Sequence, residues 1–177
     1  MNTHQLLLSP AASFATAHDI TAELNASGIR RAVIRNLASK LEFKAIQHSD
    51  MQQIWHILRN APGRTTDFSY AGLLMWVDFF HYEFAILNDT LFIKGLVEDD
   101  LDKPAFSLPI GTLPLETSVE ILKEYCRQND LTLEFSAVPE ELTHELIDLG
   151  AKELAPLQDW SDYLYSAESL ATLTGKK

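Results

Sequence analysis

The second half of the chain alternates helical and strand patterns, and this alternation restricts the possible folds more than any other feature. Residues 115–130 place apolar side chains at helical spacing, and residues 131–138 form a short apolar strand pattern. Residues 139–150 are helical again, between Pro139 and Gly150. Helix, strand and helix in succession indicate that the helices cover a sheet.

A hairpin is predicted upstream of this alternation. Residues 83–87 and 91–96 are strand patterns separated by Asn88, Asp89 and Thr90, residues that are typical of a tight turn. An antiparallel meander followed by helix–strand units predicts an α+β sheet covered by helices. The dinucleotide fingerprint Gly-x-Gly-x-x-Gly is absent, which argues against a doubly wound fold.

The remaining segments complete the predicted order of elements. We expect residues 1–15 to be loose and Asp19 to open a helix that Gly28 interrupts and that Ile29, Val33 and Leu37 continue. This helix has a basic polar face. It either binds a partner or packs on the domain, and we favour packing. Further strands are predicted at residues 41–46, 105–110 and 162–166. Further helices are predicted at residues 51–58 and 69–80, and a last, apolar helix is expected to begin near Leu170.

Composition and charge narrow the class of protein. A chain of 177 residues with 46% hydrophobic residues suits one domain with an appended segment. No apolar run approaches the roughly 18 residues that cross a bilayer, and the N-terminus lacks the basic region of a secretory signal. The single Cys126 excludes an intramolecular disulfide and fits a reducing, cytoplasmic setting. Its helical context indicates a small core residue rather than a nucleophile.

The charge is distributed unevenly along the chain. Residues 1–64 hold seven basic and four acidic residues, whereas residues 65–177 hold seven basic and 21 acidic ones, so the net charges are +3 and −14. An acidic body repels phosphate backbones and anionic lipid surfaces. We therefore expect no direct nucleic-acid footprint on this chain.

Few motifs point to a specific chemistry. The six histidines show no metal-ligand spacing, and neither a nucleophile elbow nor a P-loop occurs, so we expect no metal and no bound cofactor. The acidic run at residues 98–102 lacks the glycine and distal glutamate of a calcium loop and is interpreted as a solvated loop.

Two short segments are candidate binding sites. In "PGRTTDFSYAGLLMW", Arg64 precedes a helix start whose free N–H groups could form an anion pocket. The alternative, which we favour, is that Arg64 pairs with Asp67 while the aromatic residues fill the core. The Pro109–Gly111 turn could bring backbone close to a ligand, although most such turns are structural.

Several segments together resemble a known bacterial family. These are "LEFKAI", "GRTTDFSYAGLLMWVDFFHYEFAILNDTLFIKG", "FSLPIG", "ILKEYCRQNDLTLEFSAVPEE" and "DYLYSAESLATLTGKK". Over residues 41–177 the chain resembles the N-terminal half of uncharacterised cytosolic proteins related to the C-terminal domain of phosphatidylglycerol lysyltransferase. Residues 1–40 have no counterpart in this resemblance, so we assign them to an N-terminal, partly helical extension and residues 41–177 to a single lobe.

The resemblance implies a fold and a kind of activity. Family members are two tandem acyltransferase folds of the GNAT (acyl-CoA N-acyltransferase) type, similar to Fem-type aminoacyl transferases. The segment "LTGKK" leads into the second lobe in that layout, so the ending is interpreted as a seam. The resemblance implies acyl or aminoacyl transfer to an amine or hydroxyl, with acyl-CoA or aminoacyl-tRNA as donor in the complete protein, and backbone amides at a strand break polarising the carbonyl.

The residues that match the family's motifs are the substrate-binding candidates. They are Arg64, Asp67, Trp76, Gly111, Lys176 and Lys177. The resemblance implies that Arg64 holds an anionic group and that the two lysines meet phosphate, against the alternative that they are solvated. Catalytic residues stay unassigned.

Two functions are consistent with the sequence. The first is an acyltransferase-like lobe that is inactive alone and needs a second lobe or a partner chain. The second is a non-catalytic binding module that keeps the transferase fold. In either case we expect self-association through an exposed sheet edge or apolar patch.

Overall fold

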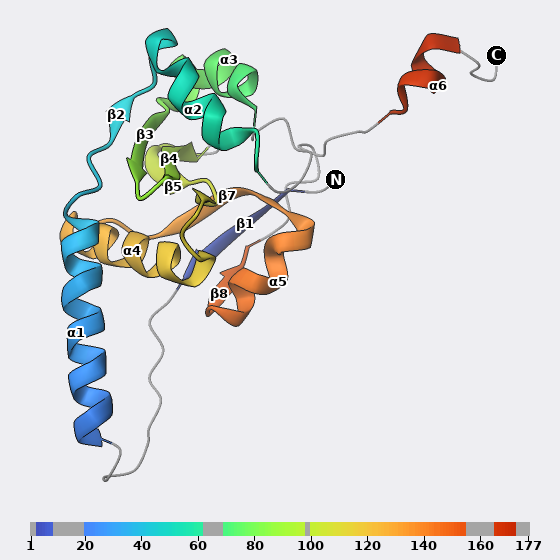
Figure 1. Cartoon of the computed structure of the whole chain (residues 1–177). Helices are drawn as coiled ribbons and strands as arrows, with labels where there is room; N and C mark the ends of the chain where they lie inside the picture. The colour runs from blue at the N-terminus through green and yellow to red at the C-terminus, as the bar shows by residue number, and fades with distance from the viewer. Residues whose placement is uncertain (1–2, 9–19, 62–68, 98–99, 155–164, 173–177) are drawn as a thin grey trace.

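The chain forms one mixed sheet flanked by helices (Figure 1). The computed structural model describes residues 3–8, 20–61, 69–97, 100–154 and 165–172, and the statements below concern those residues. The helices are α1 (Ile20–Ala38), α2 (Met51–Leu58), α3 (Tyr70–Phe80), α4 (Leu115–Gln128), α5 (Glu140–Asp148) and α6 (Ala167–Thr172). The strands are β1 (Thr3–Leu8), β2 (Lys44–Ala45), β3 (Glu83–Leu87), β4 (Thr90–Val97), β5 (Asp100–Phe106), β6 (Ile110–Gly111), β7 (Glu134–Pro139) and β8 (Ala151–Glu153).

The described strands join in the order β2-β3-β4-β5-β7-β1-β8, and β6 pairs with β4 beside this path. All of these pairs are antiparallel except β5 and β7, which run parallel. Helices α2 and α3 lie against β4, whereas α5 lies against β7, β1 and β8. The prediction of an α+β fold with a mainly antiparallel sheet is confirmed.

The predicted hairpin is the regular part of the sheet. Strands β3 and β4 pair from Leu87 opposite Thr90 to Glu83 opposite Lys94. Asn88 and Asp89 form the two-residue connection, with φ of 48° and 52°. Positive φ at both central positions is what a type I′ turn requires, and Asn and Asp tolerate it better than most residues.

The N-terminal segment differs from the expectation. We predicted that residues 1–15 are loose, yet Thr3–Leu8 forms β1, which pairs with β7 on one side and β8 on the other. Leu6, Leu7 and Leu8 are too short an apolar run to indicate a strand, because a strand pattern of this length is recognisable only beside its partners. The division of the chain at residue 40 stays a prediction, although β1 and α1 both contact the part that follows.

Helix α1 packs along α4, which agrees with the prediction that it packs on the domain rather than binding a partner. It is one continuous helix, so Gly28 does not interrupt it. The predicted stripe of Ile29, Val33 and Leu37 is only partly correct, because Ile29 and Val33 are exposed, while Ile34 and Leu37 pack against the core. The helix meets the domain along a face rotated from the one that the spacing suggested.

Other predicted boundaries shift by a few residues. The strand predicted at 41–46 is reduced to β2, and the strand predicted at 105–110 begins earlier as β5, so part of the acidic run lies in a strand. The strand predicted at 162–166 falls mostly outside the described residues. Helix α6 follows Ser166, and its side chains are exposed.

The core lies between the sheet and α4, α2 and α3. Val119, Leu122 and Cys126 of α4 are buried, as predicted from their spacing. Burial raises the pKa of the Cys126 thiol to about 12. The burial of Cys126 confirms its interpretation as a small core residue, and a raised pKa disfavours the reactive thiolate form.

One ion pair joins the two parts of the sheet. Glu134, the first residue of β7, is 1% exposed, and its carboxylate pairs with the ammonium of Lys103 on β5. The Lys103 side chain is 40% exposed, so it remains in contact with water. Removing Lys103 would therefore leave a buried charge without a partner, whereas removing the charge of Glu134 would leave a lysine that is still in contact with water.

We predict that the two substitutions of this pair have unequal effects. Lys103→Met leaves a buried carboxylate without its cation and should lower the free energy of unfolding by about 3 kcal/mol. Glu134→Gln leaves a lysine that can reach water and should cost about 1 kcal/mol. Urea unfolding of both variants measures the difference. An equal or larger cost for Glu134→Gln would contradict the assigned burial.

The free energy of unfolding should depend on pH through Glu124 of α4, which accepts hydrogen bonds from residues of α4 and of α1. Hydrogen bonds from Arg127, then from Gln128 and Arg35, hold the pKa of Glu124 at about 2, below its ordinary value of 4.5. The stabilisation is complete above about pH 4.5 and is lost as the pH falls toward 2, because the unfolded chain takes up the proton first.

We therefore expect Glu124→Gln to reduce the free energy of unfolding at pH 6 by at most about 3 kcal/mol. At pH 2.5 the difference between the variant and the natural chain should be much smaller. Urea unfolding at both pH values provides the measurement. A pH-independent difference would show that packing, rather than the charge of Glu124, accounts for the effect.

Candidate functional site

The sheet divides where β5 ends. The parallel contact between β5 and β7 has a single register pair, Phe106 opposite Phe135. Beyond it, Ser107 N–H donates to the Ile93 carbonyl at 3.1 Å, so the chain that leaves β5 stays with β4. Strand β7 continues instead beside β1. The C-terminal ends of two neighbouring parallel strands thus separate.

The β7 side of this division contains a β-bulge. Phe135 pairs with Leu6 and Val138 pairs with His4, so Ser136 and Ala137 together oppose a single residue of β1. Ala137 has a φ of 55°, which a non-glycine residue rarely adopts. Bulges re-aim the backbone and are frequent beside active sites.

A pocket of about 350 Å³ lies at the same end of β5. Its walls come from α2, the hairpin turn and the segment that connects β5 with α4. The lining residues are His56, Ile57, Asn60, Asp89, Pro109, Ile110, Gly111, Thr112, Leu113 and Leu115. This combination of apolar walls with a few polar groups is typical of small-molecule sites.

Gly111 shapes this pocket. Its φ of 153° lies in a region that residues with a side chain rarely adopt, and an added Cβ would overlap the Asp89 carbonyl oxygen and the Thr90 backbone. The backbone around it is held by the hairpin, because the buried Thr90 hydroxyl accepts the Leu113 N–H at 2.9 Å. The Thr112 hydroxyl donates to the Asn88 carbonyl at 2.7 Å.

The start of α4 borders the pocket. Pro114 is its N-cap and has no side-chain acceptor for the first N–H groups of the helix, and Leu115 lines the pocket. The first N–H groups of a helix and its dipole favour negative charge nearby. The described walls thus combine a fixed backbone turn, the positive end of a helix, an imidazole, an amide and the carboxylate of Asp89.

The structure brings few of the predicted site residues together. Gly111 lines the pocket, whereas Trp76 does not; it lies on α3 among the rings of Phe79 and Phe80, at centroid distances of 6.1 Å and 6.0 Å. Four predicted residues lie outside the described part of the chain. They are Arg64, Asp67, Lys176 and Lys177.

Sequence reasoning missed the contribution of α2. His56 and Asn60 line the pocket although they were considered only as part of a helix and its end. Their separation by four residues places them on one face of a helix, which is the signal that could have singled them out. The role of Thr90 could not be foreseen, because Leu113, 23 residues further along the chain, meets it only when the segment after β6 folds back onto the hairpin.

Other classes of site were also considered. Within the described ranges, no three His, Cys, Asp or Glu side chains form a group that could hold a metal ion. None of the described helices has the length and apolarity needed to cross a membrane.

We predict opposite effects for two glycine substitutions. Gly111→Ala forces an unfavourable φ and a steric overlap, and should lower the free energy of unfolding by about 2–4 kcal/mol. Gly28→Ala is the matched control, since nothing lies within 4 Å of a Cβ in the middle of α1, and should raise stability by about 0.5–1 kcal/mol. Thermal or urea unfolding distinguishes them, and a neutral Gly111→Ala would refute the assigned turn.

Comparison with known proteins identifies the fold and the family. A crystal structure described as a conserved protein of unknown function from Bacteroides thetaiotaomicron VPI-5482 aligns with a TM-score of 0.63 and 23% identity, over 77% of this chain and 46% of that one. The likeness concerns the fold, and the chain spans less than half the length of this neighbour. No curated protein matches the chain. Residues 59–177, more than half of the chain, match the family described as phosphatidylglycerol lysyltransferase, C-terminal, and the chain therefore belongs to that family.

Proposed function

We propose that this domain takes part in the transfer of an acyl or aminoacyl group to an amine or hydroxyl. The observation that carries the proposal is the divided sheet, found in a member of a transferase-related family. In GNAT-type folds, the opening between two parallel strands receives the donor. In this proposal, the division beyond the single Phe106–Phe135 pair of β5 and β7 takes that part.

The proposed chemistry depends on position rather than on a nucleophile. A donor ester or thioester placed beside an acceptor amine reacts faster when its carbonyl is polarised by fixed N–H groups. The bulge at Ser136 and Ala137 supports this role, because it turns backbone out of the regular ladder beside the division. Cys126, buried and protonated, takes no part.

We further propose that the donor occupies the pocket around Gly111. Acyl-CoA and aminoacyl-tRNA both combine an acyl group with phosphates. The apolar walls suit an acyl chain or side chain, and the positive end of α4 suits a phosphate or carboxylate. The other candidate residues stay proposed contacts to the donor or to the acceptor. They are Arg64, Asp67, Trp76, Lys176 and Lys177.

A partner lobe completes the site in this proposal. Large apolar side chains are exposed on α2 and α3, among them Trp55, Met75 and Phe79, and Met75 is 71% exposed. Exposed apolar side chains that gather into one patch mark interfaces. We propose that a second lobe or a second copy covers it, and that the protein works in the cytoplasm.

The second candidate function is a non-catalytic module that retains the fold. It is favoured by the lack of an assigned catalytic side chain in the described part of the pocket, where only His56 and Asp89 are titratable. Binding of a donor distinguishes the two candidates.

We expect acyl-CoA or aminoacyl-tRNA to bind the chain at micromolar strength in isothermal titration calorimetry. His56→Ala should weaken this binding several-fold by removing an imidazole from the pocket. His144→Ala, which removes an exposed imidazole from α5, is the matched control and should leave the affinity unchanged. If neither donor gave a detectable heat of binding, the result would count against a transferase. Equal effects of His56→Ala and His144→Ala on the affinity would exclude the Gly111 pocket as the donor site.

We also expect the chain to self-associate through α2 and α3. Light scattering should give a mass above that of one chain at high concentration, and Met75→Glu should restore the monomer by placing a charge in the apolar surface. A natural chain that is monomeric at every concentration would contradict this part of the proposal.

A further inference from the structure

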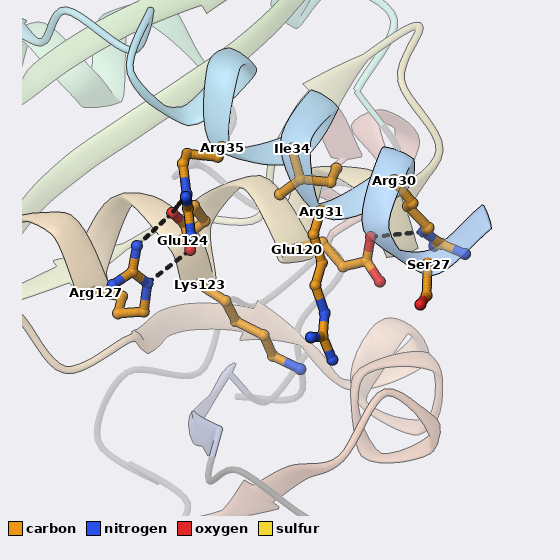
Figure 2. A pocket seen from close by; sticks show the side chains of 9 residues that line it. All are labelled: Ser27, Arg30, Arg31, Ile34, Arg35, Glu120, Lys123, Glu124 and Arg127. Carbon is orange, nitrogen blue, oxygen red and sulfur yellow. Dashed lines mark hydrogen bonds and ion pairs between the residues drawn. The ribbon is translucent and has the colours of Figure 1, made fainter. Parts of the chain in front are cut away.

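A second pocket lies between α1 and α4, away from the Gly111 pocket, and the two share no lining residue. It measures about 560 Å³, within the range of small-molecule sites. Figure 2 shows its lining, which comes from both helices. The residues are Ser27, Arg30, Arg31, Ile34, Arg35, Glu120, Lys123, Glu124 and Arg127.

The pocket is basic in an acidic protein. Five of its lining side chains are cationic and two are anionic, whereas the whole chain has a formal net charge of −11. The three arginines contributed by α1 belong to the basic face that the sequence indicated. In the structure this face meets α4 and forms one wall of a concave surface.

The carboxylates on α4 are already paired. Arg30 donates to Glu116 at 2.8 Å and to Glu120 at 3.0 Å. Glu124 accepts from Arg127 at 2.6 Å and 2.7 Å. Arg30 therefore links α1 to α4, whereas the pair of Glu124 with Arg127 lies within α4, and each of these acids already has an arginine partner.

Two cationic side chains of this pocket remain available to bind a ligand. Arg31 has neither a hydrogen bond nor an ion pair with another residue in the described part of the chain. Lys123 donates one hydrogen bond, to the Leu149 carbonyl at 3.3 Å, which leaves two ammonium protons. Figure 2 shows the side chains of Arg31 and Lys123 extending toward the same side of the pocket.

A guanidinium and an ammonium that extend to the same side of a pocket, neither of them paired with a described carboxylate, suit a phosphate group. Arginine binds phosphate through its planar fork and lysine binds it as a compact charge. A small ligand experiences chiefly this local field, since charges beyond about 8 Å are screened at physiological salt. An extended polyanion such as RNA, or an anionic membrane, would also meet the acidic remainder of the protein.

We propose that the α1–α4 pocket binds a small molecule with a phosphate group, held by Arg31 and Lys123. The ion pairs of Arg30 with Glu116 and Glu120, and of Arg35 with Glu124, hold the two helices around it. This site is independent of the proposed donor pocket, so either can exist without the other.

The test is isothermal titration calorimetry of the full chain with inorganic pyrophosphate and with ADP at physiological salt, where distant charges are screened. The pocket variant is Arg31→Ala/Lys123→Ala. The control variant, Arg59→Ala/Lys152→Ala, removes one arginine and one lysine that do not line this pocket, so the change in net charge is the same. All four side chains are exposed, and circular dichroism checks that both variants fold.

We expect the pocket variant to weaken binding at least about tenfold and the control variant to change it less than twofold. Arg31→Lys should retain part of the affinity, since it keeps the charge and loses the fork. No binding below millimolar concentration, or equal weakening in both variants, would overturn the proposal. A short RNA duplex and anionic vesicles serve as further arms, and binding confined to either of them would overturn it as well.

Discussion

The contact between β5 and β7 is the constraint on which the rest of the structure depends. The two strands belong to separate parts of the sheet, one continued by the β3–β4 hairpin and the other by β1 and β8. They meet through one register pair and the ion pair of Lys103 with the buried Glu134. Because the contact is parallel, the chain must cross over between the strands, and α4 forms that crossover.

The same constraint creates the candidate site. A regular sheet would have paired β5 and β7 along their length and left no division. Here, the chain after Phe106 turns back to β4, and Gly111 makes that return possible because only glycine fits the approach to Asp89 and Thr90. The pocket lies along the segment that returns from β5 to β4 and is bordered by the start of α4, whereas the bulge at Ala137 lies on the β7 side of the division.

The α1–α4 pocket has a different origin. It arises because α1 lies along the crossover helix, so its arginines face the glutamates of α4. The number of cations exceeds the number of acids on this surface, and Arg31 and Lys123 are the remainder. The Gly111 pocket is thus shaped by backbone geometry, whereas the pocket between α1 and α4 is shaped by charged side chains.

The sequence by itself determined the elements with strong local signals: the hairpin around Asn88 and Asp89, the buried face of α4, and the α+β class. Local spacing is sufficient there, because a turn and a helix depend on neighbouring residues. Only the tertiary structure decided the place of β1, whose three leucines become a strand beside β7 and β8, and the role of Thr90. It also decided that Arg31 has no carboxylate partner among the described residues while Arg30 is paired, since that depends on how α1 is rotated against α4. Partners such as Leu6 and Glu153, Arg30 and Glu120, or Thr90 and Leu113 lie far apart in the sequence and give no local signal, which is why the sites could not be located before the fold.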